Sequence, residues 1–164
     1  LTVAYCGAHA RGQGTTACFH GGRRGEVGHS PAVCGEVLDV SAGPVYWKAT
    51  LKKHTGYVCL GVIGNAQPGN YSYGDPTCFG WRSDNQVWIA GKNNHGHGGW
   101  GGWQAGDVAV FKLEAQRLSM RVRRLGDQTF TMDTNGAQNL RIHVLLYQNA
   151  TRVQLSRARA ADEF

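Results

Sequence analysis

Short apolar or alternating runs, separated by glycine-rich and polar turns, constrain the fold of this sequence more than any other feature. Residues 57–63 (YVCLGVI) are almost wholly apolar, which is typical of a strand buried on both faces. Residues 45–51 (VYWKATL) and 117–123 (RLSMRVR) alternate between apolar and polar side chains, and residues 108–113 (VAVFKL) are a strong strand candidate. No segment has a sustained helical period with capping residues. Many short strands at close spacing predict an antiparallel β-sandwich or barrel.

Weaker signals complete the predicted set of strands and loops. We expect further strands at residues 1–5, 17–20, 26–29, 33–40, 77–81, 86–89, 129–132, 142–147 and 151–155. Glycine and polar residues dominate segments 11–16 and 64–76, so both are predicted to be loops.

The composition agrees with a single folded domain spanning residues 1–164. A chain of 164 residues is long enough to bury a sizeable core. Hydrophobic residues make up 41% and charged residues only 17%, which excludes a disordered tail. The 24 glycines favour a β-rich fold with many turns.

The net charge of +6 raises the question of nucleic acid. The basic residues do not form one stripe, because Arg121 and Arg123 lie in one alternating run while Arg152, Arg157 and Arg159 lie near the C-terminus. Residues two apart in a strand share a face, so we expect Arg121 and Arg123 to face solvent together. We interpret them as a solvated strand face rather than a phosphate-binding patch, and do not expect nucleic acid as the partner. No apolar run is long enough to span a membrane.

The five cysteines are interpreted as reduced thiols. Their number is odd and none of their spacings resembles CxxC. Cys59 lies inside the apolar run 57–63, where a small apolar side chain suits a core strand. Reduced thiols predict an intracellular, cytoplasmic protein.

The segment 92–107 (KNNHGHGGWGGWQAGD) offers residues for metal or phosphate chemistry but lacks the rest of such sites. His95 and His97 could reach one ion, yet a structural zinc site needs four ligands and no nearby Cys or His spacing supplies them. The segment also lacks the GxxxxGK[ST] pattern of a phosphate-binding loop. We therefore interpret both histidines as surface loop residues and expect no metal and no other cofactor.

The sequence also lacks a recognisable catalytic constellation. There is no GxSxG elbow, and no cysteine lies in a known nucleophile context. Paired carboxylates for glycoside hydrolysis are hard to identify among 11 acidic residues. We expect no catalytic residues and a protein that is not an enzyme.

Two tryptophans in the same segment are candidates for packing or recognition. Trp100 and Trp103 are three residues apart, so in a strand they would point to opposite faces. We assign Trp103 to the core and predict that Trp100 is an exposed anchor, since tryptophan is enriched at binding hot spots. The alternative is that Trp100 lies across the glycines of its own loop.

Five segments, in this order, resemble those of a SPRY domain. They are VYWKATL, GYVCLGVI, TCFGWRSDNQVWIAGKNN, WQAGDVAVFKLEAQRLSMRV and IHVLLYQNATRVQL, and the resemblance covers residues 17–155. One departure is that the Asn-Gly turn expected after the returning strand reads Arg124-Leu125-Gly126-Asp127, while Asn135-Gly136 comes later. The strand register between Arg124 and Leu140 is therefore open.

The resemblance implies an all-β fold and a function in protein interaction. The implied fold is a bent sandwich of two antiparallel sheets whose loops at one end make a binding surface, as in tripartite-motif and SOCS-box SPRY proteins. The positions that match the family's peptide pocket, together with the tryptophan above, are Arg23, Arg24, Tyr71, Tyr73, Trp100, Tyr147, Gln148 and Asn149. The family's Trp-Gly at the closing turn is replaced by Tyr147-Gln148. The alternative for Tyr71 and Tyr73 is that they only pack their loop onto the sheet.

The resulting hypothesis is a monomeric module that binds a peptide segment or a folded protein partner. The resemblance implies that it is the substrate-recognition part of a ubiquitin ligase or scaffold protein. The rival hypothesis is a carbohydrate-binding module of lectin type, in which an exposed Trp100 would stack on a sugar face and segment 64–75 would bind hydroxyl groups.

Overall fold

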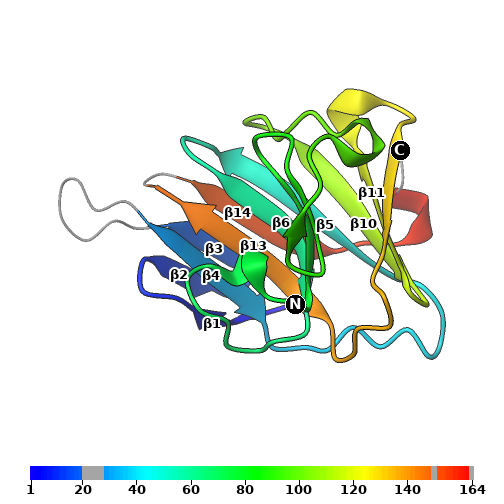
Figure 1. Ribbon diagram of the computed structural model, residues 1–164, viewed down its shortest axis with the longest axis horizontal. Helices are drawn as coiled ribbons and strands as arrows, with labels where there is room; N and C mark the ends of the chain where they lie inside the picture. Colours follow the sequence, from blue (N-terminus) through cyan, green and yellow to red (C-terminus); the bar gives the residue numbers. More distant parts are fainter. Residues whose placement is uncertain (20–27, 149–150, 163–164) are drawn as a thin grey trace.

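The protein is a sandwich of two antiparallel sheets, each of seven strands (Figure 1). The computed structural model describes residues 1–19, 28–148 and 151–162. The first sheet has the order β1 (Val3–Cys6), β4 (His29–Cys34), β13 (Arg141–Tyr147), β6 (Val58–Ile63), β7 (Cys78–Arg82), β8 (Val87–Ile89) and β9 (Lys92–Asn93). The second has the order β12 (Thr129–Asp133), β11 (Arg117–Val122), β10 (Val108–Glu114), β5 (Val45–Lys53), β14 (Arg152–Arg157), β3 (Thr16–Phe19) and β2 (Ala10–Gln13). This architecture confirms the predicted all-β sandwich.

Short 3₁₀ turns are the only helical elements among the described residues. They are η1 (Ser72–Gly74), η2 (His97–Gly99), η3 (Arg123–Leu125) and η4 (Ala160–Asp162). Within the described part of the chain, no helix has the length and apolar character needed to cross a membrane.

The core lies between the sheets and follows the alternation of the strands. Trp47 on β5 and Phe111 on β10 are register partners, and their rings stack with centroids 5.1 Å apart. Both side chains are buried. Their neighbours in sequence, such as Lys48 and Lys112, point to the outer face, as the period of two in a strand requires.

The outer face of the first sheet is covered by the long loop between β6 and β7. All residues of β6 are buried, which confirms the prediction that this run is enclosed on both faces. Val33, Ile63 and Cys78 form a small second cluster on this outer face, against which Tyr5 packs. The Tyr5 hydroxyl donates a hydrogen bond to the carbonyl of Pro68 in the loop, at 2.9 Å. The loop therefore buries apolar residues that would otherwise face solvent.

Two predictions at the N-terminal side were wrong. Segment 11–16, predicted to be a loop, contains the edge strand β2, which pairs with β3 over four positions. Its residues after Ala10 are exposed, so backbone pairing defines the strand and no apolar pattern announces it. Segment 33–40, predicted to be a strand, leaves the sheet after Cys34, because Val37 is exposed and Leu38 bonds instead to the carbonyl of Leu140.

The register between Arg124 and Leu140 follows from two turns. β11 and β12 pair antiparallel from Arg117–Asp133 to Arg121–Thr129, and η3 lies in the connection between them. After β12 the chain turns at Asn135 and Gly136, which have φ values of 52° and 73°. An asparagine and a glycine are the residues that tolerate this left-handed conformation, so the Asn-Gly pair lies one strand later than expected.

Candidate partner-binding site

Six rings gather on the outer side of the first sheet, and we call them the aromatic cluster. They are His29, Tyr57, Tyr71, Tyr73, Trp88 and Tyr147. His29 begins β4 and Tyr147 ends β13, and the two are register partners with ring centroids 4.6 Å apart. Tyr57, immediately before β6, lies 5.4 Å from Tyr147. The cluster therefore forms where three neighbouring strands begin or end.

The turn η1 brings two tyrosines into the cluster. Ser72 is buried between them, and its hydroxyl lies 2.9 Å from Nε2 of the buried His143. The rings of Tyr71 and Tyr73 lie 5.7 and 5.1 Å from the ring of His29. Tyr71 is 70% exposed, so much of its ring is open to a partner.

Arg82 lies among these rings. Its guanidinium carbon is 4.5 Å from the ring centroid of Tyr57 and 5.6 Å from that of Tyr73. Its Nη1 donates to Oε1 of Gln86 at 2.9 Å, and its Nε lies 3.5 Å from a carboxylate oxygen of Asp84. The side chain is only 11% exposed, so packing holds the guanidinium in place between two aromatic faces.

Several polar atoms of this region are buried without a hydrogen-bond partner among the described residues. They are Nε2 of His29 and Nε1 of Trp88, together with Nε of Arg82 and Oδ1 of Asp84, which form an ion pair with each other at 3.5 Å but no hydrogen bond. A buried polar group that forms no hydrogen bond costs about 1–3 kcal/mol, so such groups are rare in folded proteins. The cluster is therefore a place where buried polar groups lack hydrogen bonds within the described part of the chain.

Two rings of the cluster, His29 and Tyr73, are neutral near pH 7. Burial lowers the pKa of His29 below its ordinary value of 6.5, and the positive charge of Arg82 lowers it further. Burial raises the pKa of Tyr73 above its ordinary value of 10. Arg82 therefore lies in a cluster in which neither His29 nor Tyr73 carries a charge near pH 7.

Comparison with known proteins identifies the fold. No family model and no curated protein matches the sequence. Among solved structures, the SPRY domain of human HERC1 has a TM-score of 0.66 at 13% identity, covering 88% of this chain and 89% of that chain. A human SPRY domain has a TM-score of 0.68 at 14% identity, with 93% and 96% covered, and the TRIM65 PSpry domain has 0.63 at 18% identity, with 92% and 86% covered.

The chain has the SPRY fold. At identities of 13–18% the likeness is one of fold. The agreement extends over most of each chain, well beyond the five segments that carried the resemblance in sequence.

The SPRY fold brings together three of the predicted site residues. Tyr71, Tyr73 and Tyr147 all belong to the aromatic cluster. Gln148 follows Tyr147 directly and has a φ of 70°. Three further predicted residues lie outside the described part of the chain: Arg23, Arg24 and Asn149.

Four residues of the cluster were missed by the sequence analysis: His29, Tyr57, Arg82 and Trp88. A signal for Arg82 was present, because Phe79 and Trp81 on β7 are buried in the core and alternation then directs Arg82 to the outer face. His29 and Tyr57 lie at strand ends, where alternation gives no assignment.

The prediction that Trp100 is an exposed anchor was wrong. Its side chain is 1% exposed, and its Nε1 donates to the carbonyl of Arg82 at 2.7 Å. Trp103 is buried as predicted and donates in the same way to the carbonyl of Trp81. The two rings meet edge to face, 4.7 Å apart, because the intervening backbone is not a regular strand and does not send them to opposite faces. The lectin hypothesis loses the sugar-stacking surface that it placed at Trp100.

Glycine conformation explains why both tryptophans reach the core. Gly102 lies between them with a φ of 111°, and a Cβ there would collide with the carbonyl oxygen of Ser83. Only glycine allows the chain to pass so close to that neighbouring backbone. The glycines thus allow close packing of the loop against the sheet.

The two histidines of this loop do not assemble a metal site. Nδ1 of His95 lies 2.7 Å from Oδ1 of Asn85. Within the described ranges, no three His, Cys, Asp or Glu side chains are grouped so that they could hold a metal ion.

Proposed function

We propose that the chain is a protein-interaction module that binds an extended peptide segment at the aromatic cluster. The observation that carries this proposal is the combination of an exposed tyrosine, a packed arginine and unpaired polar atoms in one place. Tyr71 offers a rigid amphipathic surface, and Arg82 offers a fixed cation. Tyrosine and arginine are among the residues that contribute most to binding at protein interfaces.

The unpaired atoms favour a peptide ligand in particular. Nε1 of Trp88 is a donor and Nε2 of His29 can accept or donate, and neither forms a hydrogen bond among the described residues. A peptide backbone supplies both a carbonyl and an N–H group at every residue except proline, so it can bind both kinds of atom. Such a ligand would gain affinity by satisfying groups that are already desolvated.

We include in the proposal the wider context of the module. It would act without catalysis or a cofactor, as a monomer, in the substrate-recognition part of an intracellular ubiquitin ligase or scaffold protein. SPRY domains of HERC1 and TRIM65 share its fold, which supports an interaction role in general. The residues Arg23, Arg24, Gln148 and Asn149 remain part of the proposed surface.

A peptide-display selection tests the binding mode. Random linear peptides are selected on the wild-type protein, and their affinities are then measured for Tyr71→Ala and Tyr73→Ala by fluorescence anisotropy. Loss of one such anchor is expected to weaken binding by about tenfold or more, because hot-spot residues contribute about 2 kcal/mol or more. Tyr46→Ala is the matched control, because Tyr46 is a tyrosine of the second sheet that approaches Lys112.

Four outcomes decide between the hypotheses. Weaker peptide binding by Tyr71→Ala and Tyr73→Ala, with unchanged binding by Tyr46→Ala, supports the proposal. Equal affinities in all four proteins would refute it, as would a selection that enriches no peptide. If the protein binds glycans on an array saturably and Tyr71→Ala abolishes that binding, the result would favour the lectin hypothesis.

A further inference from the structure

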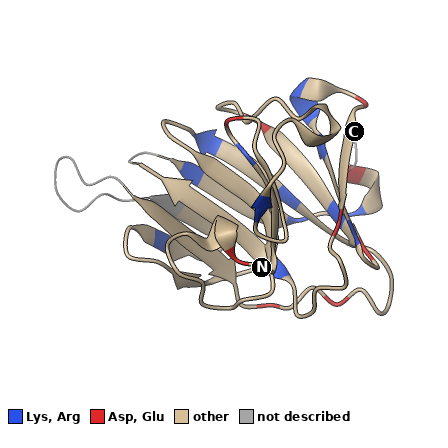
Figure 2. Ribbon diagram, in the orientation of Figure 1, with Lys and Arg blue, Asp and Glu red and all other residues tan. Residues whose placement is uncertain are grey.

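The outer face of the second sheet is strongly basic. Residues that alternate with the buried core positions of this sheet point outward, and many carry charge. The basic ones include Arg11, Lys48, Lys112, Arg117, Arg121 and Arg152, and the acidic ones include Glu114 and Asp133. Figure 2 shows Lys and Arg on several strands of the sandwich. We call this surface the basic face.

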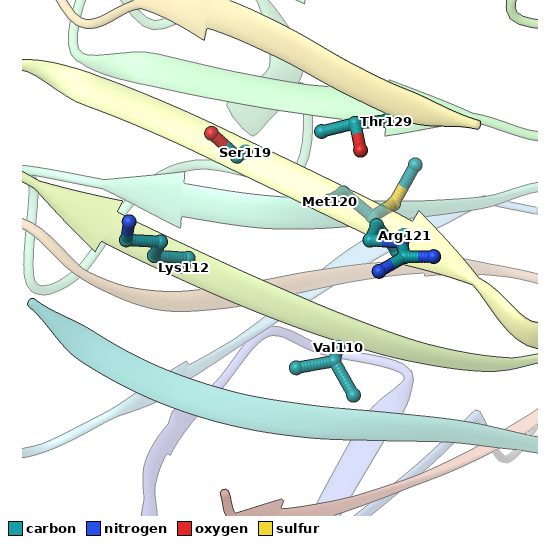
Figure 3. Close-up of a pocket in the computed structure, with 6 residues that line it drawn as sticks. All are labelled: Val110, Lys112, Ser119, Met120, Arg121 and Thr129. Carbon is teal, nitrogen blue, oxygen red and sulfur yellow. The ribbon is translucent and has the colours of Figure 1, made fainter. Parts of the chain in front are cut away.

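A hollow of about 190 Å³ lies in the basic face, over β10, β11 and β12 (Figure 3). Val110 pairs with Arg121, and Lys112 pairs with Ser119. These four residues form a square on the outer face. The long side chains of Lys112 and Arg121 lie on one diagonal and the short side chains of Val110 and Ser119 on the other, which leaves space over Val110 and Ser119. Thr129, the partner of Arg121 on β12, adds a second hydroxyl to the wall.

Three cations surround Val110. It pairs with Arg121 on one side and with Lys48 on the other, and Lys112 is two residues further along the same strand. Neighbouring strands are about 4.8 Å apart, and alternate residues of a strand are about 6.7 Å apart. Val110 itself is 2% exposed, and the hollow is lined by Lys112 and Arg121 but not by Lys48. An anionic group in the hollow would therefore lie within reach of Lys112 and Arg121, with Lys48 on the neighbouring strand.

The existing ion pairs do not close this site. Lys112 contacts Glu114 at 2.7 Å and Arg121 contacts Asp127 at 2.9 Å, but these acidic side chains are 52% and 105% exposed. Exposed ion pairs contribute little stability, so a partner's carboxylates can exchange with them at small cost. The Nε of Arg121 is also buried without a hydrogen-bond partner among the described residues.

A second hollow on the same face repeats this chemistry. It has a volume of about 390 Å³ and is lined by Arg11, Gln13, Thr16 and Arg152. Arg11 and Arg152 both pair with Cys18, from opposite sides. Cationic side chains therefore extend across the sheet from β11 to β2.

We propose that the basic face binds an acidic segment of a protein partner, with one carboxylate seated in the hollow beside Lys112 and Arg121. Charge complementarity selects an anion, and the internal pairs with Glu114 and Asp127 already display these cations binding carboxylates. Proteins that bind single-stranded nucleic acid stack successive bases on several aromatic rings. The ring recorded beside Lys112 is that of Tyr46, and one ring does not make such a series. This surface belongs to the other sheet from the aromatic cluster, so the two binding proposals stand independently.

Charge-neutralising variants test the site. The double variant Lys112→Gln/Arg121→Gln removes two cations of the hollow, and Lys92→Gln/Arg159→Gln removes two exposed cations elsewhere, so both lower the net charge equally. Binding of a fluorescent peptide of alternating Glu and Ser is measured by anisotropy at low and at physiological salt. Removal of two contacts, each like an exposed ion pair, is expected to weaken binding about tenfold in the first variant only.

NMR titration of isotope-labelled protein locates the bound peptide independently of the variants. The amide resonances of Val110 and Thr129 are expected to shift on titration with the peptide, and the affinity to fall as salt rises. The proposal is overturned if the wild-type protein does not bind the peptide, or if both double variants weaken binding equally. It is also overturned if an oligonucleotide of equal charge binds more tightly than the peptide. Loss of the display-selected peptides in Tyr71→Ala would leave it untouched, so the two proposals fail separately.

Discussion

Replacement of Trp100 distinguishes a core residue from a recognition residue by the size of its effect on stability. Trp100 is 1% exposed, donates to the carbonyl of Arg82 and packs against Trp103 and Phe130, with ring centroids 4.7 and 5.1 Å away. Truncation of a buried aromatic side chain to alanine costs about 3–5 kcal/mol. For a chain of this length each 1 kcal/mol shifts Tm by roughly 2–4 °C, so Trp100→Ala is expected to lower Tm by about 6–20 °C.

A graded series separates packing from the hydrogen bond. Trp100→Phe keeps an aromatic ring but loses the N–H donor and part of the ring volume, so we expect a loss of about 2 kcal/mol and a Tm lower by roughly 4–8 °C. Tyr71→Ala is the control, because this ring is 70% exposed and its removal is expected to change stability by less than about 0.5 kcal/mol.

Thermal unfolding followed by circular dichroism, with urea titration at one temperature, measures the series. The expected order of Tm is wild type and Tyr71→Ala together, then Trp100→Phe, then Trp100→Ala. A Trp100→Ala protein that melts within about 2 °C of the wild type would refute the assignment, because the loss of so much buried contact must appear in the free energy of unfolding.

Two further predictions concern the buried histidine and the glycine loop. Burial lowers the pKa of His143 from 6.5 to about 4, so the unfolded state binds more protons between these values and stability falls as pH drops through that window. From about pH 7 to pH 5 the expected loss is about 2 kcal/mol, and urea titrations should show it reduced in His143→Gln. Gly102→Ala is expected to cost about 3 kcal/mol or more, because the new Cβ would collide with the Ser83 carbonyl oxygen at a φ of 111°. Gly101→Ala, where a Cβ would meet open space, should differ little from wild type, and equal melting of the two variants would contradict the explanation.

The sequence by itself predicted the class of the fold because alternation is a local property. The runs that became β5, β6, β10, β11 and β13 were all identified from their apolar patterns. It could not predict β2, whose residues after Ala10 are exposed and whose strand conformation depends on pairing with β3. Edge strands of this kind are defined by a neighbour's backbone, which has no signature in their own side chains.

The candidate site divides in the same way. Tyr71, Tyr73 and Tyr147 could be named from the resemblance, but Arg82 and His29 could not be added to them, because residues far apart in sequence become neighbours only through the sheet order β4-β13-β6-β7.

Trp100 marks the limit of sequence reasoning most clearly. Its spacing from Trp103 indicated opposite faces only under the assumption of a regular strand. The left-handed Gly102 breaks that assumption and lets both rings donate to backbone carbonyls of the first sheet. Local sequence thus determined which segments form strands, whereas the tertiary structure decided which polar and aromatic side chains meet, because that depends on strand pairing and on backbone turns that a pattern of side chains does not specify.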